Sequence, residues 1–72
     1  MTEQEKITAL EEMMELDAGT LSADDVLENY PEWDSITVLS FISYMDEQFH
    51  KTISGQEIKA FVTVSDVLKV ME

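Results

Sequence analysis

The chain has 72 residues, with sixteen Asp or Glu, four Lys and no Arg, which gives a formal charge of −12. This charge repels nucleic acid and anionic membrane surfaces, so we expect protein partners with basic patches. The absence of cysteine excludes disulfides and thiolate metal sites, and a single domain spanning residues 1–72, with one small core, leaves little room for a deep catalytic cavity.

An amphipathic helix is predicted over residues 3–16, where Ile7, Leu10 and Met14 recur at helical spacing. It should end near residues 17–19, because Gly19 can adopt the left-handed conformation that closes many helices. The N-terminus is polar, without the apolar stretch of a signal peptide, and no segment has the ~18 apolar residues needed to cross a bilayer. A cytoplasmic protein is therefore expected.

Residues 20–34 form a long irregular connection whose scattered apolar side chains should lie against the core. Pro31 breaks any helix that continues through it. Within this connection, Ser22 is followed three residues later by Asp25, which predicts a single helical turn opened by a capping box.

The strongest helical periodicity covers residues 35–49, where apolar side chains recur three and four positions apart. Ile36 and Leu39 widen this apolar stripe, so we expect a helix with neighbours on two sides. The residues of the main stripe are Val38, Phe41, Ile42, Met45 and Phe49.

Two further capping-box patterns predict a short helix after Ser54 and a last helix after Thr63. The β-branched residues within 61–64 are also compatible with a strand, but no partner run with a period of two exists elsewhere. The sequence therefore predicts an all-α fold with three principal helices and one short helix.

Ser35 differs from the other residues at predicted helix starts. Thr2, Ser22, Ser54 and Thr63 each have an acid three residues later, whereas Ser35 is followed by Val38. Asp34 is itself a good N-cap, and if it caps the helix, the hydroxyl of Ser35 points outward from the first turn. Local hydrogen bonding remains the common role of a serine at such a position, so the Asp-Ser dipeptide alone is weak evidence.

The longer stretch around Ser35 is more specific. Asp34, Ser35 and Ile36 resemble the Asp-Ser-Leu motif at the start of the second helix of acyl and peptidyl carrier proteins. The resemblance continues through residues 45–49, Ile53 and residues 63–64 without a gap. It covers residues 34–71 closely and residues 3–33 loosely, and Trp33 before the motif resembles specialised members more than those of fatty-acid synthesis.

The resemblance implies a right-handed four-helix bundle that carries acyl groups as thioesters on a 4′-phosphopantetheine arm and has no enzyme activity of its own. Ser35 matches the serine to which a phosphopantetheinyl transferase attaches the arm from coenzyme A with magnesium, and Asp34 matches the acid before it. The only histidine, His50, lies about four helical turns from Ser35, so no catalytic triad can form.

The resemblance also implies contacts with partners and cargo. Ile36 matches an apolar residue that partners touch, and Asp46 and Glu47 are the acids that remain on a helix where Ser40 and Ser43 stand in place of others. These serines favour a dedicated pathway over fatty-acid synthesis. Tyr44, Ile58 and Phe61 are the bulky residues expected at a cleft for short or polar cargo.

Other functions remain open. A D-alanyl, other aminoacyl or peptidyl carrier uses the same serine and arm with a different loading ligase. An acidic helical adaptor that never carries an arm is the alternative from another class, and a hydrolase is hindered by the lack of a base near Ser35. We expect a monomer without a resident metal, in which charge repulsion raises the pKa of some carboxylates.

Overall fold

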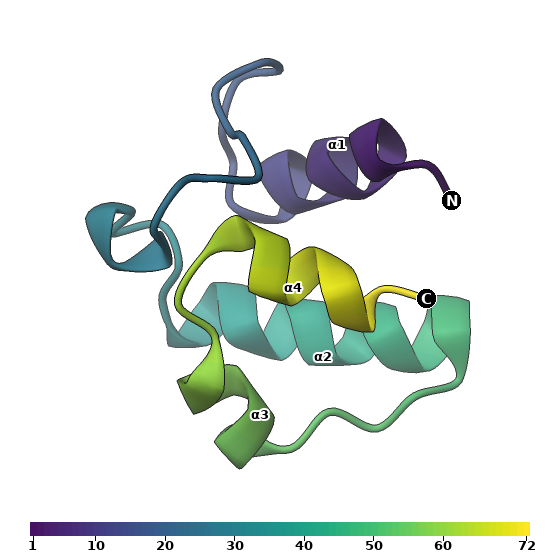
Figure 1. Cartoon of the computed structure of the whole chain (residues 1–72). Coiled ribbons are helices and arrows are strands. Elements are labelled where there is room, and N and C mark those ends of the chain that lie inside the picture. The colour runs from purple at the N-terminus through teal and green to yellow at the C-terminus, as the bar shows by residue number, and fades with distance from the viewer.

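The computed structural model describes residues 1–72. Its helical elements are α1 (Glu3–Met13), the short 3-10 helix η1 (Leu27–Asn29), α2 (Ser35–Phe49), α3 (Gly55–Ala60) and α4 (Val64–Val70). Figure 1 shows α4 running along α2, with α1 and α3 on opposite sides of this pair. The predicted four-helix architecture is therefore present, and α3 is its shortest α-helix. None of these helices combines the length and apolar character needed to cross a membrane.

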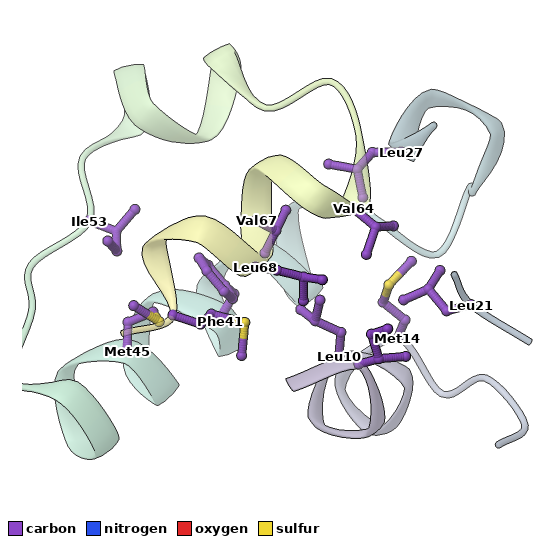
Figure 2. Close-up of a cluster of buried hydrophobic side chains, with 12 residues drawn as sticks. Leu10, Met14, Leu21, Leu27, Phe41, Met45, Ile53, Val64, Val67 and Leu68 are labelled. Carbon is purple, nitrogen blue, oxygen red and sulfur yellow. The ribbon is translucent and has the colours of Figure 1, made fainter. Parts of the chain in front are cut away.

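A single apolar cluster joins the four α-helices and the two long connections. Phe41 and Met45 of α2 are fully buried, as are Val64 and Val67 of α4. Figure 2 shows the side chains of α4 pointing toward those of α1 and α2. The buried apolar residues are Ile7, Leu10, Met14, Leu21, Leu27, Phe41, Met45, Ile53, Val64, Val67, Leu68 and Met71.

The helix starts follow the capping patterns in the sequence. Thr2 and Thr63 form complete capping boxes, in which the hydroxyl accepts from the N3 amide and the N3 carboxylate accepts from the N-cap amide. Ser54 forms half of one: its hydroxyl oxygen accepts from the Glu57 amide at 3.2 Å, but the Glu57 carboxylate accepts from the hydroxyl rather than from the backbone.

The predicted end of the first helix near Gly19 is wrong. α1 ends at Met13, and the left-handed residue that follows is Glu15, with φ of 58°. The Leu16 amide donates to the Glu11 carbonyl at 2.8 Å, and the Glu15 amide donates to that of Glu12, which is a Schellman closure. Tertiary packing places the reversal here, because Met14 must turn into the core. Gly19 serves a separate turn, with φ of 86°.

The predicted helical turn at residues 22–25 is also replaced by a simpler structure. The Asp25 carboxylate accepts from the Ser22 amide at 2.8 Å, but only a turn forms there, and the 3-10 helix begins at Leu27. The connection then pairs with the segment before α4, through a single antiparallel bridge between Val26 and Thr63. The β-branched residues near Thr63 thus make one bridge and no strand.

Glu11 holds the connection after α1 in place. Its side chain is buried, and Oε2 accepts a hydrogen bond from the Leu21 amide at 3.0 Å, while Oε1 has no partner. Leu21 is itself buried, so this hydrogen bond satisfies a main-chain donor that water cannot reach.

We expect Glu11→Ala to lower the free energy of unfolding by about 1–3 kcal/mol, because it leaves the buried Leu21 amide without an acceptor. Glu12→Ala, which removes the same charge from an exposed neighbour, should change it by less than about 0.5 kcal/mol. Urea denaturation followed by circular dichroism measures both. Equal losses in the two variants would contradict a structural role for Glu11.

Candidate functional site

Ser35 is the first residue of α2, and its side chain is exposed to solvent. The hydrogen bonds at this helix start are made by its neighbours, Asp34 and Thr37, and none involves the Ser35 hydroxyl. The first amides of a helix have no partner within the helix, and they carry the positive end of its dipole. Ser35 therefore presents a free hydroxyl beside groups that favour an attached anion.

Asp34 is the N-cap of α2, as predicted. Its Oδ1 accepts from the Thr37 amide at 2.9 Å, and its carbonyl accepts from the Val38 amide. The hydrogen bond from the Thr37 amide holds the pKa of Asp34 below its usual value, outweighing the opposing effect of burial. Asp34 therefore stays ionised at neutral pH, and Ser35 is left out of the capping interactions.

Two contacts fix the chain on either side of Ser35. The Thr37 hydroxyl is buried and donates to the Glu32 carbonyl at 2.7 Å, which ties the first turn of α2 to the preceding connection. The Trp33 ring meets Phe41 edge to face, with centroids 5.8 Å apart. Ser35 is thus held at a defined, outward-facing position, and Trp33 is an anchor for the loop.

The expected rise in carboxylate pKa values is not what the structure gives. The carboxylates with a displaced pKa are Glu5, Asp25, Asp34 and Asp66, and in each the pKa is lowered. The main cause in every case is a hydrogen bond donated by a backbone amide, as at capping positions. At these acids, short-range hydrogen bonding outweighs the repulsion expected from the net charge.

The pKa of Asp34 is lower in the folded state than in the unfolded state. Its ionised form therefore stabilises the folded protein at any pH above the ordinary pKa of aspartate. This stabilisation is lost as the pH falls through the lowered pKa of the folded state. We expect Asp34→Ala to lower the Tm at neutral pH, through the loss of the cap. The difference from the unmodified sequence should shrink in strong acid. Asp24→Ala removes the same charge without a cap, so thermal melts of this control should show no comparable fall.

No histidine lies near Ser35. His50 lies at the other end of α2, about 22 Å away along the helix, and Asp34, the acid next to Ser35, is engaged in capping α2. A serine hydroxyl is a weak nucleophile until a base accepts its proton. Ser35 therefore lacks the serine–histidine pair of a catalytic triad.

The predicted partner-recognition residues lie on one uncovered side of α2. Ile36 is 75% exposed, and Asp46 and Glu47 are also exposed. Leu39 is 65% exposed, so the prediction that Ile36 and Leu39 face a second neighbouring helix is wrong. α2 joins the core through the side that carries Phe41 and Met45, and Ile36 and Leu39 lie outside this contact.

Of the three residues expected at a cargo cleft, Ile58 and Phe61 lie together at the end of α3, where the Phe61 amide donates to the Ile58 carbonyl at 3.2 Å. Tyr44 lies on the side of α2 near α1, where its hydroxyl is 3.6 Å from the Met1 sulfur. Phe61 instead packs edge to face on Phe41, with centroids 6.2 Å apart, and Ile58 is partly buried against the core. Neither Ile58 nor Phe61 lines a hollow of the surface.

Two adjoining hollows lie on the opposite side, along α1 and α2. Both are lined by Met13, Ile36 and Ser40. The first also contains Asp34, and the second extends to Tyr44. Sequence reasoning did not find Met13, Leu39, Ser40 and Ser43 as lining residues, although the helical spacing of residues 36, 40, 43 and 47 places them on one face.

Comparison with known proteins was made at three levels. No family model and no curated protein matches the chain. Among solved structures, a protein of Mycobacterium tuberculosis provisionally described as an acyl carrier protein is similar, with a TM-score of 0.73 and 26% identity over 93% of this chain and 90% of that one. The chain has the fold of the acyl carrier protein family.

This fold confirms the expected resemblance to the acyl carrier protein family and the expected all-α architecture. In this chain, α2 begins with an exposed serine. The similarity covers nearly the whole chain, including the first helix and the long connection, where the sequence resemblance is loose.

Proposed function

We propose that this protein is an acyl carrier that holds acyl intermediates on a 4′-phosphopantetheine arm attached to Ser35. The observation that carries the proposal is an exposed serine at the first position of α2, in a chain with the acyl carrier protein fold. An arm of this kind supplies a terminal thiol, which carries an acyl group as a thioester.

The residues around Ser35 suit this group. The hydroxyl is exposed and free of hydrogen bonds to Asp34 or Thr37, so a transferase can reach it without unfolding the helix. A phosphodiester at this position lies beside the first amides of α2, which offset part of the repulsion from Asp34 and Glu32. The lack of a histidine near Ser35 fits a substrate whose modifying enzyme, a phosphopantetheinyl transferase, brings its own base and magnesium.

The partners we propose are that transferase and acyl-loading or acyl-transferring enzymes with basic surfaces. Asp46 and Glu47 are exposed on α2, at the end of the helix away from Ser35, where they are available to such surfaces. The middle of the exposed side carries Ser40 and Ser43 instead of acids. The lack of acids in the middle of this side supports recognition by the enzymes of a dedicated biosynthetic pathway rather than by those of fatty-acid synthesis.

An aminoacyl carrier is a second candidate, because it needs the same serine and arm and differs only in its ligase. The packed interior favours short or polar cargo for either candidate. Phe41, Met45 and Met71 are fully buried and fill the centre of the bundle, so a long acyl chain has no enclosed space to enter. Mass analysis showing long-chain fatty acids on the protein from its native cell would contradict this part of the proposal.

The test is to incubate the purified protein with coenzyme A, magnesium and a phosphopantetheinyl transferase of broad specificity, and to measure its intact mass. We expect a gain equal to one phosphopantetheine. No gain on protein that is folded by circular dichroism would overturn the carrier function and favour the acidic helical adaptor.

A further inference from the structure

We propose that Phe61 is a positioning residue for Ser35. Through Phe41 and Trp33, its ring holds the segment that precedes α2 in the arrangement that a phosphopantetheinyl transferase binds. This inference rests on the proposed function, since it concerns the attachment of the arm to the same serine. It makes the end of α3 a determinant of that attachment, although α3 lies far from Ser35 in the chain.

Trp33 anchors the segment that leads into α2. Residues 31–36 are all exposed except Trp33, which is partly buried and packs against the core. The hydrogen bonds of Asp34 and Thr37 join this segment to the first turn of α2, but they make no contact with the core. The position of the segment relative to the core therefore depends on the Trp33 ring.

Phe41 connects Trp33 to the end of α3. The Trp33 and Phe41 rings meet edge to face, with centroids 5.8 Å apart and planes at 63°. Phe61, the C-cap residue of α3, meets the same Phe41 ring edge to face, with centroids 6.2 Å apart and planes at 86°. Phe41 is completely buried, so a change in its contact with one ring alters its contact with the other. The three rings form a continuous contact from the end of α3 to the residue before Asp34.

Main-chain hydrogen bonds join the same two regions of the chain. The Leu27 amide donates to the Val62 carbonyl, and the Val64 amide donates to the Asp25 carbonyl, both at 2.9 Å. The connection that leads to α2 is thus bound to the segment between α3 and α4. A shift at the end of α3 therefore reaches this connection through the backbone as well as through the aromatic rings.

A smaller residue in place of Phe61 removes one of the two rings that enclose Phe41. Because a packed interior has little spare volume, we expect Phe41, and Trp33 with it, to move toward the void. The segment from Trp33 to Ser35 then keeps its present arrangement for only part of the time. If that fraction is about one third, a transferase that needs this arrangement binds the protein about threefold more weakly, with little change in its rate once bound.

The first experiment compares Phe61→Leu with the unmodified sequence before any arm is attached, after circular dichroism has shown that the variant is folded. Trp33 is the only tryptophan, so the fluorescence of the protein reports the surroundings of its ring. We expect Phe61→Leu to shift both the emission maximum of Trp33 and the amide signal of Ser35 in the nuclear magnetic resonance spectrum. If Phe61→Leu is not folded, Phe61→Met takes its place, because the flexible methionine side chain fills irregular spaces.

Phe49→Leu is the matched control. Phe49 is also partly buried, and it meets one ring, that of Tyr44, edge to face with centroids 6.2 Å apart, at the other end of α2 from Ser35. This variant should leave the Trp33 emission and the Ser35 signal unchanged. If either signal stays unchanged in the folded Phe61 variant, or if both shift equally in Phe49→Leu, the inference is overturned.

The second experiment measures the rate of arm attachment by intact mass, at several concentrations of each folded protein. We expect the KM of the transferase to be about threefold higher for the Phe61 variant than for Phe49→Leu and the unmodified sequence, with kcat unchanged. If the unmodified sequence gains no arm, the proposed function fails. If it gains the arm, and the Phe61 variant has the same KM as Phe49→Leu or differs only in kcat, the positioning role alone is overturned.

Discussion

Ser35→Ala is expected to abolish the mass gain that coenzyme A, magnesium and a phosphopantetheinyl transferase produce on the unmodified sequence. The variant removes the only atom of this residue that can form the phosphodiester bond. Alanine is well tolerated in helices, and the Asp34 cap does not use the Ser35 side chain, so the fold should be unchanged. Intact mass and circular dichroism on the same sample separate lost attachment from lost structure.

Ser22→Ala provides the matched control. Ser22 is an exposed serine in the connection between α1 and α2, and it also follows the sequence pattern of a helix start. This variant should be modified as fully as the unmodified sequence. If Ser35→Ala still gains one phosphopantetheine, the arm is attached elsewhere, and the assignment of Ser35 is wrong.

Phe41→Ala is expected to lower the free energy of unfolding by about 3–5 kcal/mol. Phe41 is completely buried and contacts the rings of both Trp33 and Phe61, so its removal leaves a cavity among three segments of the chain. Small domains have a total stability of only about 5–15 kcal/mol, so much of the protein could be unfolded at physiological temperature. Urea denaturation at low temperature, followed by circular dichroism, measures the loss.

Leu39→Ala is the control for this second prediction. It shortens an apolar side chain on the same helix, but Leu39 is 65% exposed, so the change should be within about 0.5 kcal/mol. A small loss in Phe41→Ala, similar to that in Leu39→Ala, would mean that the bundle does not depend on the aromatic contacts around Phe41.

The features around Ser35 could largely be predicted from the sequence, because they depend on interactions between near neighbours. Asp34 caps α2 through an amide only three residues away, and α2 has the predicted bounds of residues 35–49. The capping boxes at Thr2 and Thr63 depend on contacts of the same short range. Such local interactions have a direct signature in residue type and spacing.

The errors arose where distant segments decide the structure. Nothing local distinguishes Gly19 from Glu15 as the residue that closes α1, because the choice depends on Met14 and Leu21 entering the core. The single bridge between Val26 and Thr63 is likewise invisible in either segment alone.

The same limit applies to the exposed side of α2. The apolar pattern of α2 does not say which side its neighbours cover, so Ile36 and Leu39 looked like packing residues until the other helices were in place. The sequence by itself determined where the four α-helices begin, the caps at Thr2, Asp34 and Thr63, and an exposed Ser35, since each follows from backbone hydrogen bonding within a few residues. Only the tertiary structure decided that Trp33 and Phe61 enclose Phe41 while Ile36 and Leu39 stay exposed, because burial depends on contacts between residues far apart in the chain.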